Sequence, residues 1–455
     1  MDNGPPSPAG VPDVVPLREA TKAWFLVSLQ TFGGPAGQIA VMQHELVDKR
    51  RWIGQRRFLH ALNFCMLLPG PEAQQLATYS GWLLNGRRGG LIAGSLFVLP
   101  GAVAMLALSA VYVAAGDTEV VTGLFAGLAP AVVAIVLQAV QRVGRRALHG
   151  PVLVVLAVAS FVAVAFLAVP FPLVIALAAL AGWLLGRVDR LPEPTAHDET
   201  VDGPSPLVSD EALHHDAPSG VRTAGGAVLG VLLWLTPVAI AALLWGRDSV
   251  FAEQGVFFAG TAVISFGGAY AVLAYVASQA VTVFGWLAPG EMVRGLALAE
   301  TTPGPLIMVV QFVAFLGAYR DPGPLDPWVA AVVASGLVVW VTFVPSFLLV
   351  FFGAPYVERL RHNRALTSAL TGITASVVGV IASLALYFAV NTLFDETREV
   401  DAGPVHVLAP VWSSLDGWAV ALTVFALGLV FWRGWSPLRT LGVCAVLGLA
   451  VELLT

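Results

Sequence analysis

The feature that most constrains this chain is a 40-residue segment that occurs twice, with helix-breaking residues at both ends. The first copy runs from Phe32-Gly33-Gly34 to Pro69-Gly70-Pro71, and the second from Phe266-Gly267-Gly268 to Pro303-Gly304-Pro305. The copies lie 234 residues apart, align without a gap and share ten identical positions. Because glycine and proline both interrupt helices, the duplication places paired breaks inside apolar stretches.

The alignment continues beyond the second break, once an insertion of 11 residues in the second copy is allowed for. It then pairs Pro100 with Pro345 and Gly127 with Gly372. Two copies of one unit therefore account for most of the chain, and both copies are expected to share one fold.

The composition assigns these units to a membrane. Only 12% of the residues are charged and 57% are hydrophobic, whereas soluble domains carry about 25% charged residues. Apolar runs of about 20 residues recur, and each is long enough to cross a bilayer. Because hydrocarbon excludes unpaired backbone groups, the predicted fold class is an all-α polytopic membrane protein with interrupted or re-entrant helices. The net charge of −5 gives no indication of a nucleic-acid partner.

Four parts follow one another along the chain. Residues 1–17 are expected to be a disordered tail, residues 18–186 the first repeat, residues 187–222 an acidic linker, and residues 223–455 an extra span followed by the second repeat. Uninterrupted spans are predicted at about 90–115, 120–141, 151–168, 172–186, 224–245, 327–353, 366–392, 412–432 and 437–454. The linker is acidic and rich in proline, so a solvated segment is favoured over a metal site at His197, His214 and His215.

The basic residues indicate how the chain crosses the membrane, because cytoplasmic loops are enriched in Lys and Arg. If each interrupted stretch enters the membrane and returns to the same side as a re-entrant hairpin, 20 of the 24 basic residues face the cytoplasm. The four left outside are Arg247, Arg294, Arg320 and Arg398, and the acidic loop 395–401 also lies outside. The span at 224–245 then starts the second repeat from the opposite side. The halves would form an inverted repeat, the usual plan of a secondary transporter, with single interrupted crossings as the alternative left open.

The paired breaks predict one central binding site. A helix broken inside hydrocarbon is costly unless its ends face protein, water or a ligand. The free N–H groups at a helix start carry about half a positive charge, which suits an anion. The alternative is that these glycines and prolines only allow close helix packing or a kink.

Polar residues beside the breaks are the candidate ligands. The glycines expected to let backbone amides approach the ion are Gly33, Gly34, Gly70, Gly267, Gly268 and Gly304. The side chains predicted to bind the substrate are Gln38, Asn63, Glu72, Gln74, Gln75, Thr78, Tyr79, Glu300, Thr301 and Thr302. Carboxylates are costly at membrane depth. Glu72 and Glu300 are therefore expected to carry a coupling proton, to pair with an arginine, or to cap a helix start.

A second group, predicted to act in coupling or gating, comprises His44, Glu45, Arg50 and Arg51. His44 is either a proton relay or a hydrogen-bonded histidine at the membrane interface. The basic loop at 49–57 is either a topology anchor or a vestibule that concentrates anions, and both roles can hold at once.

The chain is not expected to be an enzyme. Its two lysines, Lys22 and Lys49, do not form a phosphate-binding loop, and no nucleophile elbow or metal-ligand cluster stands out in the membrane segments. No catalytic residue, metal or cofactor is predicted, so a gradient or the membrane potential would drive transport. The two cysteines, Cys65 and Cys444, lie in apolar surroundings and are expected to fill space.

At the residues around the breaks, the sequence resembles the chromate ion transporter family in its long two-domain form. The resembling runs are residues 32–38, 61–79, 266–273 and 299–307, which contain the Phe-Gly-Gly and Pro-Gly-Pro breaks. The likeness extends from about residue 20 to 392 and is weaker in the linker and the last two spans. It implies efflux of chromate across the inner membrane, with sulfate as a structural analogue. Arg294 is a departure, because the family tends to carry an aspartate before Gly295-Leu296.

The sequence therefore predicts a multi-pass inner-membrane secondary transporter that exports chromate and whose linker 187–222 lies in the cytoplasm. An anion channel, or a transporter of another anion such as sulfate, is the alternative. The sequence does not determine the transport direction, the coupling ion or the oligomeric state, and a homodimer stays open.

Overall fold

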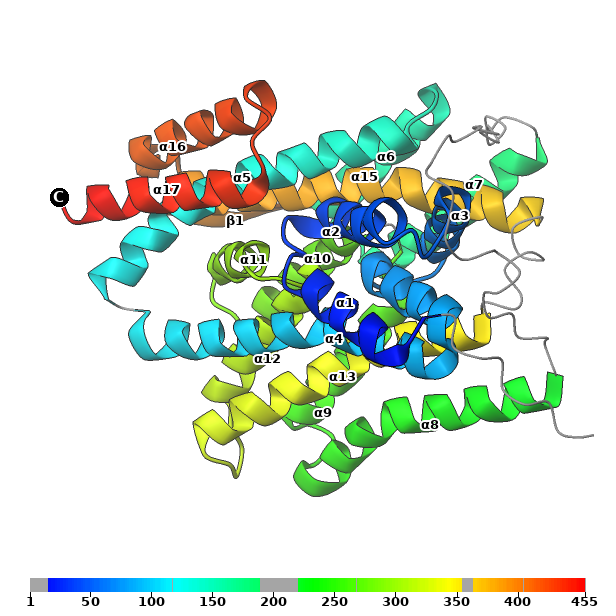
Figure 1. The fold of residues 1–455 in the computed structure, drawn as a ribbon. Helices are drawn as coiled ribbons and strands as arrows, with labels where there is room; N and C mark the ends of the chain where they lie inside the picture. The colour runs from blue at the N-terminus through cyan, green and yellow to red at the C-terminus, as the bar shows by residue number, and fades with distance from the viewer. Residues whose placement is uncertain are drawn as a thin grey trace, which may run out of the picture.

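The computed structural model of the chain describes residues 15–116, 118–188, 220–266, 268–353, 363–403 and 405–454. Gly267, residues 189–219 of the linker and most of the N-terminal tail lie outside these ranges, and so do the three linker histidines. Nearly all of the described chain is helical, and the long helices α5, α8, α13 and α15 run roughly parallel across Figure 1. Five described helices are long and apolar enough to cross a membrane. The prediction of an all-α polytopic membrane protein is confirmed.

The first half begins with short helices separated by the predicted breaks. They are α1 (Leu17–Ser28), α2 (Gly34–Gln43), the π-helical turn η1 (His44–Lys49), and α3 (Gln55–Cys65). Longer elements follow: α4 (Glu72–Ala115), α5 (Glu119–Ala147), α6 (Pro151–Ala165) and α7 (Phe171–Arg187).

Helix α4 is a hairpin of two helical arms. Asn85 and Gly86 have non-helical dihedral angles, with φ of 57° at Gly86. A Cβ placed on Gly94 would lie 2.3 Å from the Thr78 hydroxyl, although 16 residues of straight helix would span about 24 Å. The chain therefore reverses at Asn85-Gly86, and the arm that follows the first Pro-Gly-Pro packs against the first uninterrupted span.

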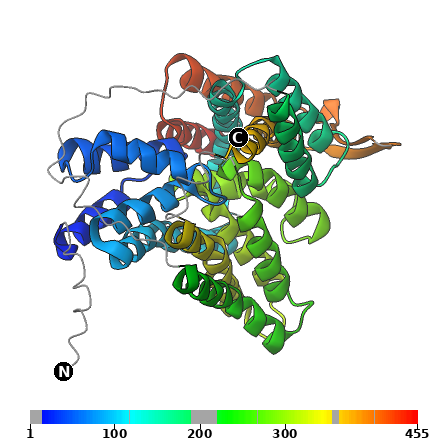
Figure 2. The ribbon, with the colours of Figure 1, turned by 90° about the vertical axis from the view of Figure 1, so that its right-hand side faces the viewer.

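The second half repeats this order after α8 (Gly220–Trp245). Its interrupted part comprises α9 (Val250–Ile264), α10 (Ala269–Ser278), the π-helical turn η3 (Gln279–Val283), α11 (Glu291–Thr301), the 3-10 turn η4 (Leu306–Met308) and α12 (Val309–Arg320). The remaining helical elements are α13 (Pro327–Gly353), α15 (Arg364–Leu393), the 3-10 turn η6 (Trp412–Ser414), α16 (Gly417–Leu427), the π-helical turn η7 (Gly428–Trp432) and α17 (Pro437–Glu452). Figure 2 looks roughly along the long helices and shows the blue helices of the first half gathered on one side of the green helices of the second.

Both interrupted stretches of the second half fold back on themselves, as the hairpin interpretation expects. At the start of α11, Glu291 accepts two bonds of 2.7 Å from Arg320 at the end of α12. The rings of Phe257 in α9 and Tyr275 in α10 lie 5.4 Å apart, on opposite sides of the break. A stretch that crossed the membrane once would hold these residues far apart. The first half shows the same fold-back, because Phe64 of α3 and Tyr79 of α4 are separated by 5.4 Å.

Helix starts follow local rules. Ser249 and Asp416 accept backbone N–H groups at the starts of α9 and α16, as N-caps do. Proline occupies the first turn of α6, α7 and α17, where its missing N–H costs nothing.

Close helix packing accounts for other glycines. A Cβ on Gly127 in α5 would lie 1.9 Å from the carbonyl oxygen of Cys444 in α17. A Cβ on Gly372 in α15 would lie 2.3 Å from the carbonyl oxygen of Ala178 in α7. In the aligned pair Gly127 and Gly372, glycine therefore allows two helices to pack closely, as small residues do in membrane helices.

The segment predicted as an acidic outer loop is instead a β-hairpin. Strands β1 (Thr397–Ala402) and β2 (Val405–Pro410) pair antiparallel, from Thr397 with Pro410 to Ala402 with Val405. Gly403 has φ of 63° in the turn, and β-branched residues such as Val400 and Val407 favour strands. The hairpin projects from the edge of the molecule in Figure 2.

The two repeats also share backbone details that the alignment alone does not show. The π-helical turns η1 and η3 occupy equivalent positions. Gly70 and Gly304 have φ of 113° and 97°. Arg51 and Gly285, which also align, have φ of 55° and 65°. Arg51 therefore holds a left-handed conformation that costs a non-glycine residue about 1–2 kcal/mol.

We expect Arg320→Gln to lower the thermal stability, because the buried Glu291 carboxylate would lose its two charged bonds. The cost is on the order of 2 kcal/mol, and the melting temperature of the purified protein in detergent measures it. Arg247→Gln removes an exposed arginine from the neighbouring loop and serves as the control. Equal melting temperatures for the two variants would contradict the structural role of this pair.

Candidate functional site

The breaks of the two halves meet through a reciprocal pair of backbone hydrogen bonds. Gly70 N–H donates to the carbonyl of Ser265 over 2.7 Å, and Gly304 N–H donates to the carbonyl of Thr31 over 3.0 Å. Thr31 and Ser265 are equivalent in the repeat, and each immediately precedes a Phe-Gly-Gly. Exchanging the two copies exchanges the two bonds, which is what a two-fold relation between halves produces. We call this region, residues 31–34, 69–71, 265, 266, 268 and 303–305, the central crossing.

The uninterrupted spans complete the reciprocal arrangement. A Cβ on Gly70 would lie 2.9 Å from the Ser346 hydroxyl of α13, in the other half. One on Gly304 would lie 3.3 Å from the Cα of Gly101 in α4, again in the other half. Gly101 and Ser346 follow the aligned prolines Pro100 and Pro345. Each Pro-Gly-Pro break is thus held by two elements of the opposite repeat, and its glycine has no room for a side chain.

The Phe-Gly-Gly breaks are more open. Helices α2 and α10 begin at these breaks, and neither start is capped by a side chain. A Cβ on Gly34 or on Gly268 would meet nothing within 4 Å, and one on Gly33 would meet only Pro437 at 3.9 Å. The first N–H groups of a helix have no intrahelical partner, so these two starts offer backbone donors. Gly267, the remaining glycine of the set, lies outside the described residues.

The buried glutamines near the breaks leave their side-chain oxygens without a hydrogen-bond partner in the described structure. Gln38 Nε2 donates to the Gly304 carbonyl over 2.6 Å, and Gln75 Nε2 donates to the Pro69 carbonyl over 2.7 Å. A carbonyl only accepts, so the amide nitrogen must face it. The Oε1 atoms of Gln38, Gln74 and Gln75 are buried without a hydrogen-bond partner in the described structure. In this conformation the glutamines therefore contribute acceptors, and donation to an anion requires the carboxamides to rotate.

The two carboxylates differ in their surroundings. Glu300 is 2% exposed. One of its oxygens accepts a short hydrogen bond from the Tyr270 hydroxyl, and Oε2 has no hydrogen-bond partner among the described residues. Glu72 is the first residue of α4 and is partly buried. Tyr270 lies in the first turn of α10, so Glu300 is tied to the helix start at the second Phe-Gly-Gly.

The other predicted ligands are held by local contacts. Thr78 bonds the Gln74 carbonyl over 2.9 Å. Thr301 and Thr302 bond carbonyls three residues earlier, over 2.8 and 3.0 Å. The Tyr79 ring packs at a tilt against those of Phe64 and Trp82, and Asn63 is exposed.

Sequence reasoning missed Thr31, Ser265, Gly101 and Ser346. The alignment of the two copies could have identified them, because they form two aligned pairs, each next to a break or a kink-forming proline.

The residues assigned to coupling or gating form a separate cluster around η1. Glu45 is buried and accepts from Lys49 Nζ over 2.6 Å and from Arg50 Nε over 3.3 Å. Burial alone would raise the pKa of Glu45, but these two cations hold it below its ordinary value. His44 and Arg51 are exposed, and His44 Nδ1 lies 3.6 Å from Asp48. The contacts within this cluster are those of an ion-paired turn.

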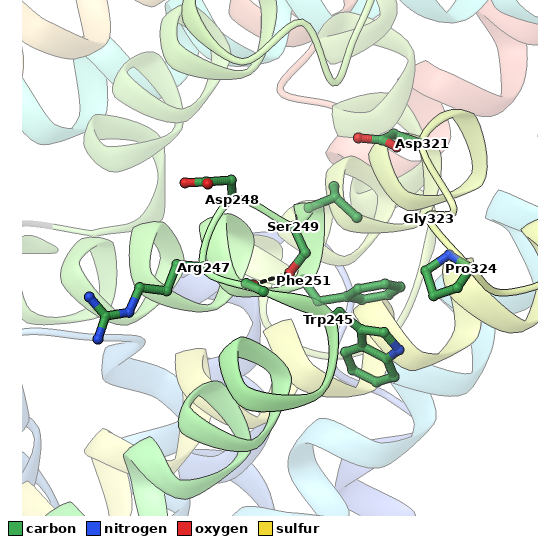
Figure 3. A pocket seen from close by; sticks show the side chains of 10 residues that line it. Trp245, Arg247, Asp248, Ser249, Phe251, Asp321, Gly323 and Pro324 are labelled. Atoms are coloured by element: carbon green, nitrogen blue, oxygen red, sulfur yellow. Dashed lines mark hydrogen bonds between the residues drawn. The ribbon is translucent and has the colours of Figure 1, made fainter.

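A surface hollow of about 340 Å³ lies elsewhere, between the α8–α9 and α12–α13 loops. Asp248 and Asp321 line it, and the Arg247 side chain points away from Asp321 in Figure 3. Ser249, also at the rim, donates its hydroxyl to the Gly246 carbonyl over 2.7 Å. Two carboxylates at the rim repel an anion, so the central crossing is the better candidate.

Comparison with known proteins identifies a family whose model matches both halves of the chain. The family model described as Chromate transporter matches residues 18–183 and 252–449. The "Chromate transport protein" of Pseudomonas aeruginosa is 31% identical over 93% of this chain and 88% of its own. The protein of that name from Cupriavidus metallidurans is 26% identical over 83% of this chain and 84% of its own.

A shorter relative matches part of the chain. The "Uncharacterized transporter YwrB" of Bacillus subtilis is 30% identical over 30% of this chain and 68% of its own. No solved structure matches the chain. With a family model that covers both repeats and a relative similar over almost the full length, the chain belongs to the chromate transporter family.

Proposed function

We propose that this protein is a secondary transporter, and not an enzyme, that exports chromate from the cytoplasm across the inner membrane. The observation that carries the proposal is the reciprocal pair of hydrogen bonds at the central crossing. It brings two helix starts and two Pro-Gly-Pro breaks together in the interior of an apolar helical protein. Membership of the chromate transporter family supports a tetrahedral dianion as the substrate.

The same contacts support an inverted orientation of the halves. Two copies related by a two-fold axis in the membrane plane would exchange contacts at their breaks, as the two bonds of the central crossing do. The enrichment of basic residues on one side supports a cytoplasmic linker. Rocking of one half against the other would then expose the central crossing to each side in turn.

The proposed site uses backbone and side-chain groups together. The N–H groups at Gly33, Gly34, Gly267 and Gly268 bind the dianion, while Gly70 and Gly304 keep the breaks close. Gln38, Asn63, Gln74, Gln75, Thr78, Tyr79, Thr301 and Thr302 supply hydrogen bonds as the substrate moves. Glu72 and Glu300 orient the helix ends or carry a coupling proton. His44, Glu45, Arg50 and Arg51 shape the cytoplasmic vestibule around η1.

Transport by purified protein tests the proposal. In proteoliposomes with an imposed potential or pH gradient, we expect labelled chromate to accumulate above its equilibrium concentration. Simple equilibration would identify an anion channel instead. Competition by sulfate at equal concentration decides between chromate and sulfate as the preferred dianion.

Gly304→Ala and Gly70→Ala are expected to abolish most chromate transport. Each glycine has a positive φ that alanine tolerates poorly, and each meets atoms of the opposite half. Gly336→Ala is the matched control, because a Cβ at Gly336 in α13 meets nothing within 4 Å. Retained transport in both variants, at normal protein levels, would argue against the central crossing.

The proposed orientation predicts which residues are labelled from each side. Both native cysteines are buried, so an added cysteine reports its own location. Ser205→Cys in the linker should react with an impermeant maleimide only in inverted vesicles. Ser413→Cys, beside the β-hairpin, should react in intact cells. The reverse pattern would invalidate the topology.

A further inference from the structure

A second polar contact between the halves lies away from the central crossing and involves charged groups. Tyr112 of α4, in the first half, donates its hydroxyl to Glu291 Oε1 over 3.0 Å. Arg294 Nη1 donates to the same hydroxyl over 3.1 Å. Glu291 and Arg294 belong to α11 of the second half, and Glu291 also accepts the two bonds from Arg320. We call Tyr112, Glu291, Arg294 and Arg320 the Tyr112 cluster.

The Tyr112 cluster joins two helices that both run away from the central crossing. Gly101 of α4 lies against Gly304, and α11 ends at Thr301, just before the same break. Tyr112 and Glu291 each lie about ten residues further along their helices, which corresponds to roughly 15 Å. Under the proposed topology the cluster is at the outer end, because Arg294 is among the basic residues left outside.

One buried face of α4 connects the central crossing with the cluster. Gly101, Met105, Ser109 and Tyr112 are buried and recur every three or four residues, so they lie on one side of the helix. The Tyr112 ring packs edge-on against Phe312 of the second half, with the ring centres 5.2 Å apart. The Ser109 hydroxyl, one turn before Tyr112, is buried without a hydrogen-bond partner in the described structure. Such a group is satisfied if water reaches this face when the halves part.

The distribution of bonds suits a contact that opens and closes. Glu291 keeps Arg320 and the Ala288 N–H as partners inside the second half. Parting the halves at the cluster therefore breaks the two bonds of the Tyr112 phenol and leaves the ion pair intact. Losing a hydrogen bond of a neutral group costs less than separating a buried ion pair. By contrast, the ion pairs described at η1, toward the end predicted to face the cytoplasm, lie within the first half.

We propose that Tyr112 is the outer latch of the transporter, a hydrogen-bonded contact that holds the halves together on the outer side of the central crossing. The latch is closed while the substrate enters from the cytoplasm and opens when the substrate leaves. Arg294 orients the latch, because its donation to the phenol oxygen directs the phenol proton to Glu291. The inference rests on the proposed function and gives a role to Arg294, which sequence reasoning left without one.

Labelling of a cysteine placed beneath the latch tests the inference. In right-side-out membrane vesicles that carry Ser109→Cys, Tyr112→Phe is expected to raise the rate of reaction with an impermeant maleimide about tenfold. That factor corresponds to the loss of hydrogen bonds to two charged groups, while the aromatic packing is kept. Arg294→Gln should raise the rate by less, because the bond to Glu291 stays. Tyr319→Phe in α12 is the control, since its hydroxyl makes no hydrogen bond to the described residues.

The native cysteines distinguish an opened latch from general loosening. Cys65 and Cys444 are buried, and in Tyr112→Phe without the added thiol they should stay unreactive. Their reaction at the rate of Ser109→Cys would overturn the inference, and so would equal Ser109→Cys rates in Tyr112→Phe and Tyr319→Phe. An unchanged rate in Arg294→Gln would remove Arg294 from the latch. Labelling needs no chromate, so failure of the proposed function looks different: the wild-type protein would not accumulate chromate although the labelling rates differ.

Discussion

The structure depends on the need to satisfy backbone groups where helices are interrupted inside an apolar protein. Gly70 and Gly304 lie in backbone conformations that a helix cannot use, so their N–H groups need partners elsewhere. Those partners are carbonyls of the opposite half, at Ser265 and Thr31. Neither half can therefore complete its own breaks. Two copies of the unit are a structural requirement of this fold.

The same requirement explains why the interior is rich in acceptors. Interrupting a helix frees carbonyl groups as well as amides, and the glutamine Nε2 groups bind carbonyls at Gly304 and Pro69. Each such bond leaves a carboxamide oxygen facing the interior. Residues that stabilise the breaks thus make their surroundings less favourable for an anion, whereas the N–H groups at the helix starts favour one.

Much of the fold could be predicted from the sequence, because helix breakers inside apolar runs are conspicuous and the duplication shows which breaks are equivalent. The uninterrupted spans also follow from pattern alone, whereas the reversal at Asn85-Gly86 was not predicted. Contacts between halves could not be predicted, since an alignment pairs Thr31 with Ser265 without saying that each binds the other copy's glycine. Gln75 follows a break in the sequence, but the direction of its amide depends on the Pro69 carbonyl, which only the fold positions. The β-hairpin was missed because its acidic residues resemble a loop.

The differences between the halves bear on the direction of transport. Extending the alignment of Gly127 with Gly372 along the two helices pairs Arg142 with Tyr387 and Arg146 with Asn391. Under the proposed inverted arrangement, these neutral residues of α15 would lie toward the opposite face of the membrane. A dianion would then meet two guanidiniums at the cytoplasmic end of α5 and neutral side chains at the outer end of α15. Coulomb attraction favours capture on the first side and release on the second. Two halves with one backbone plan can thus support export because the charges on equivalent helices have diverged.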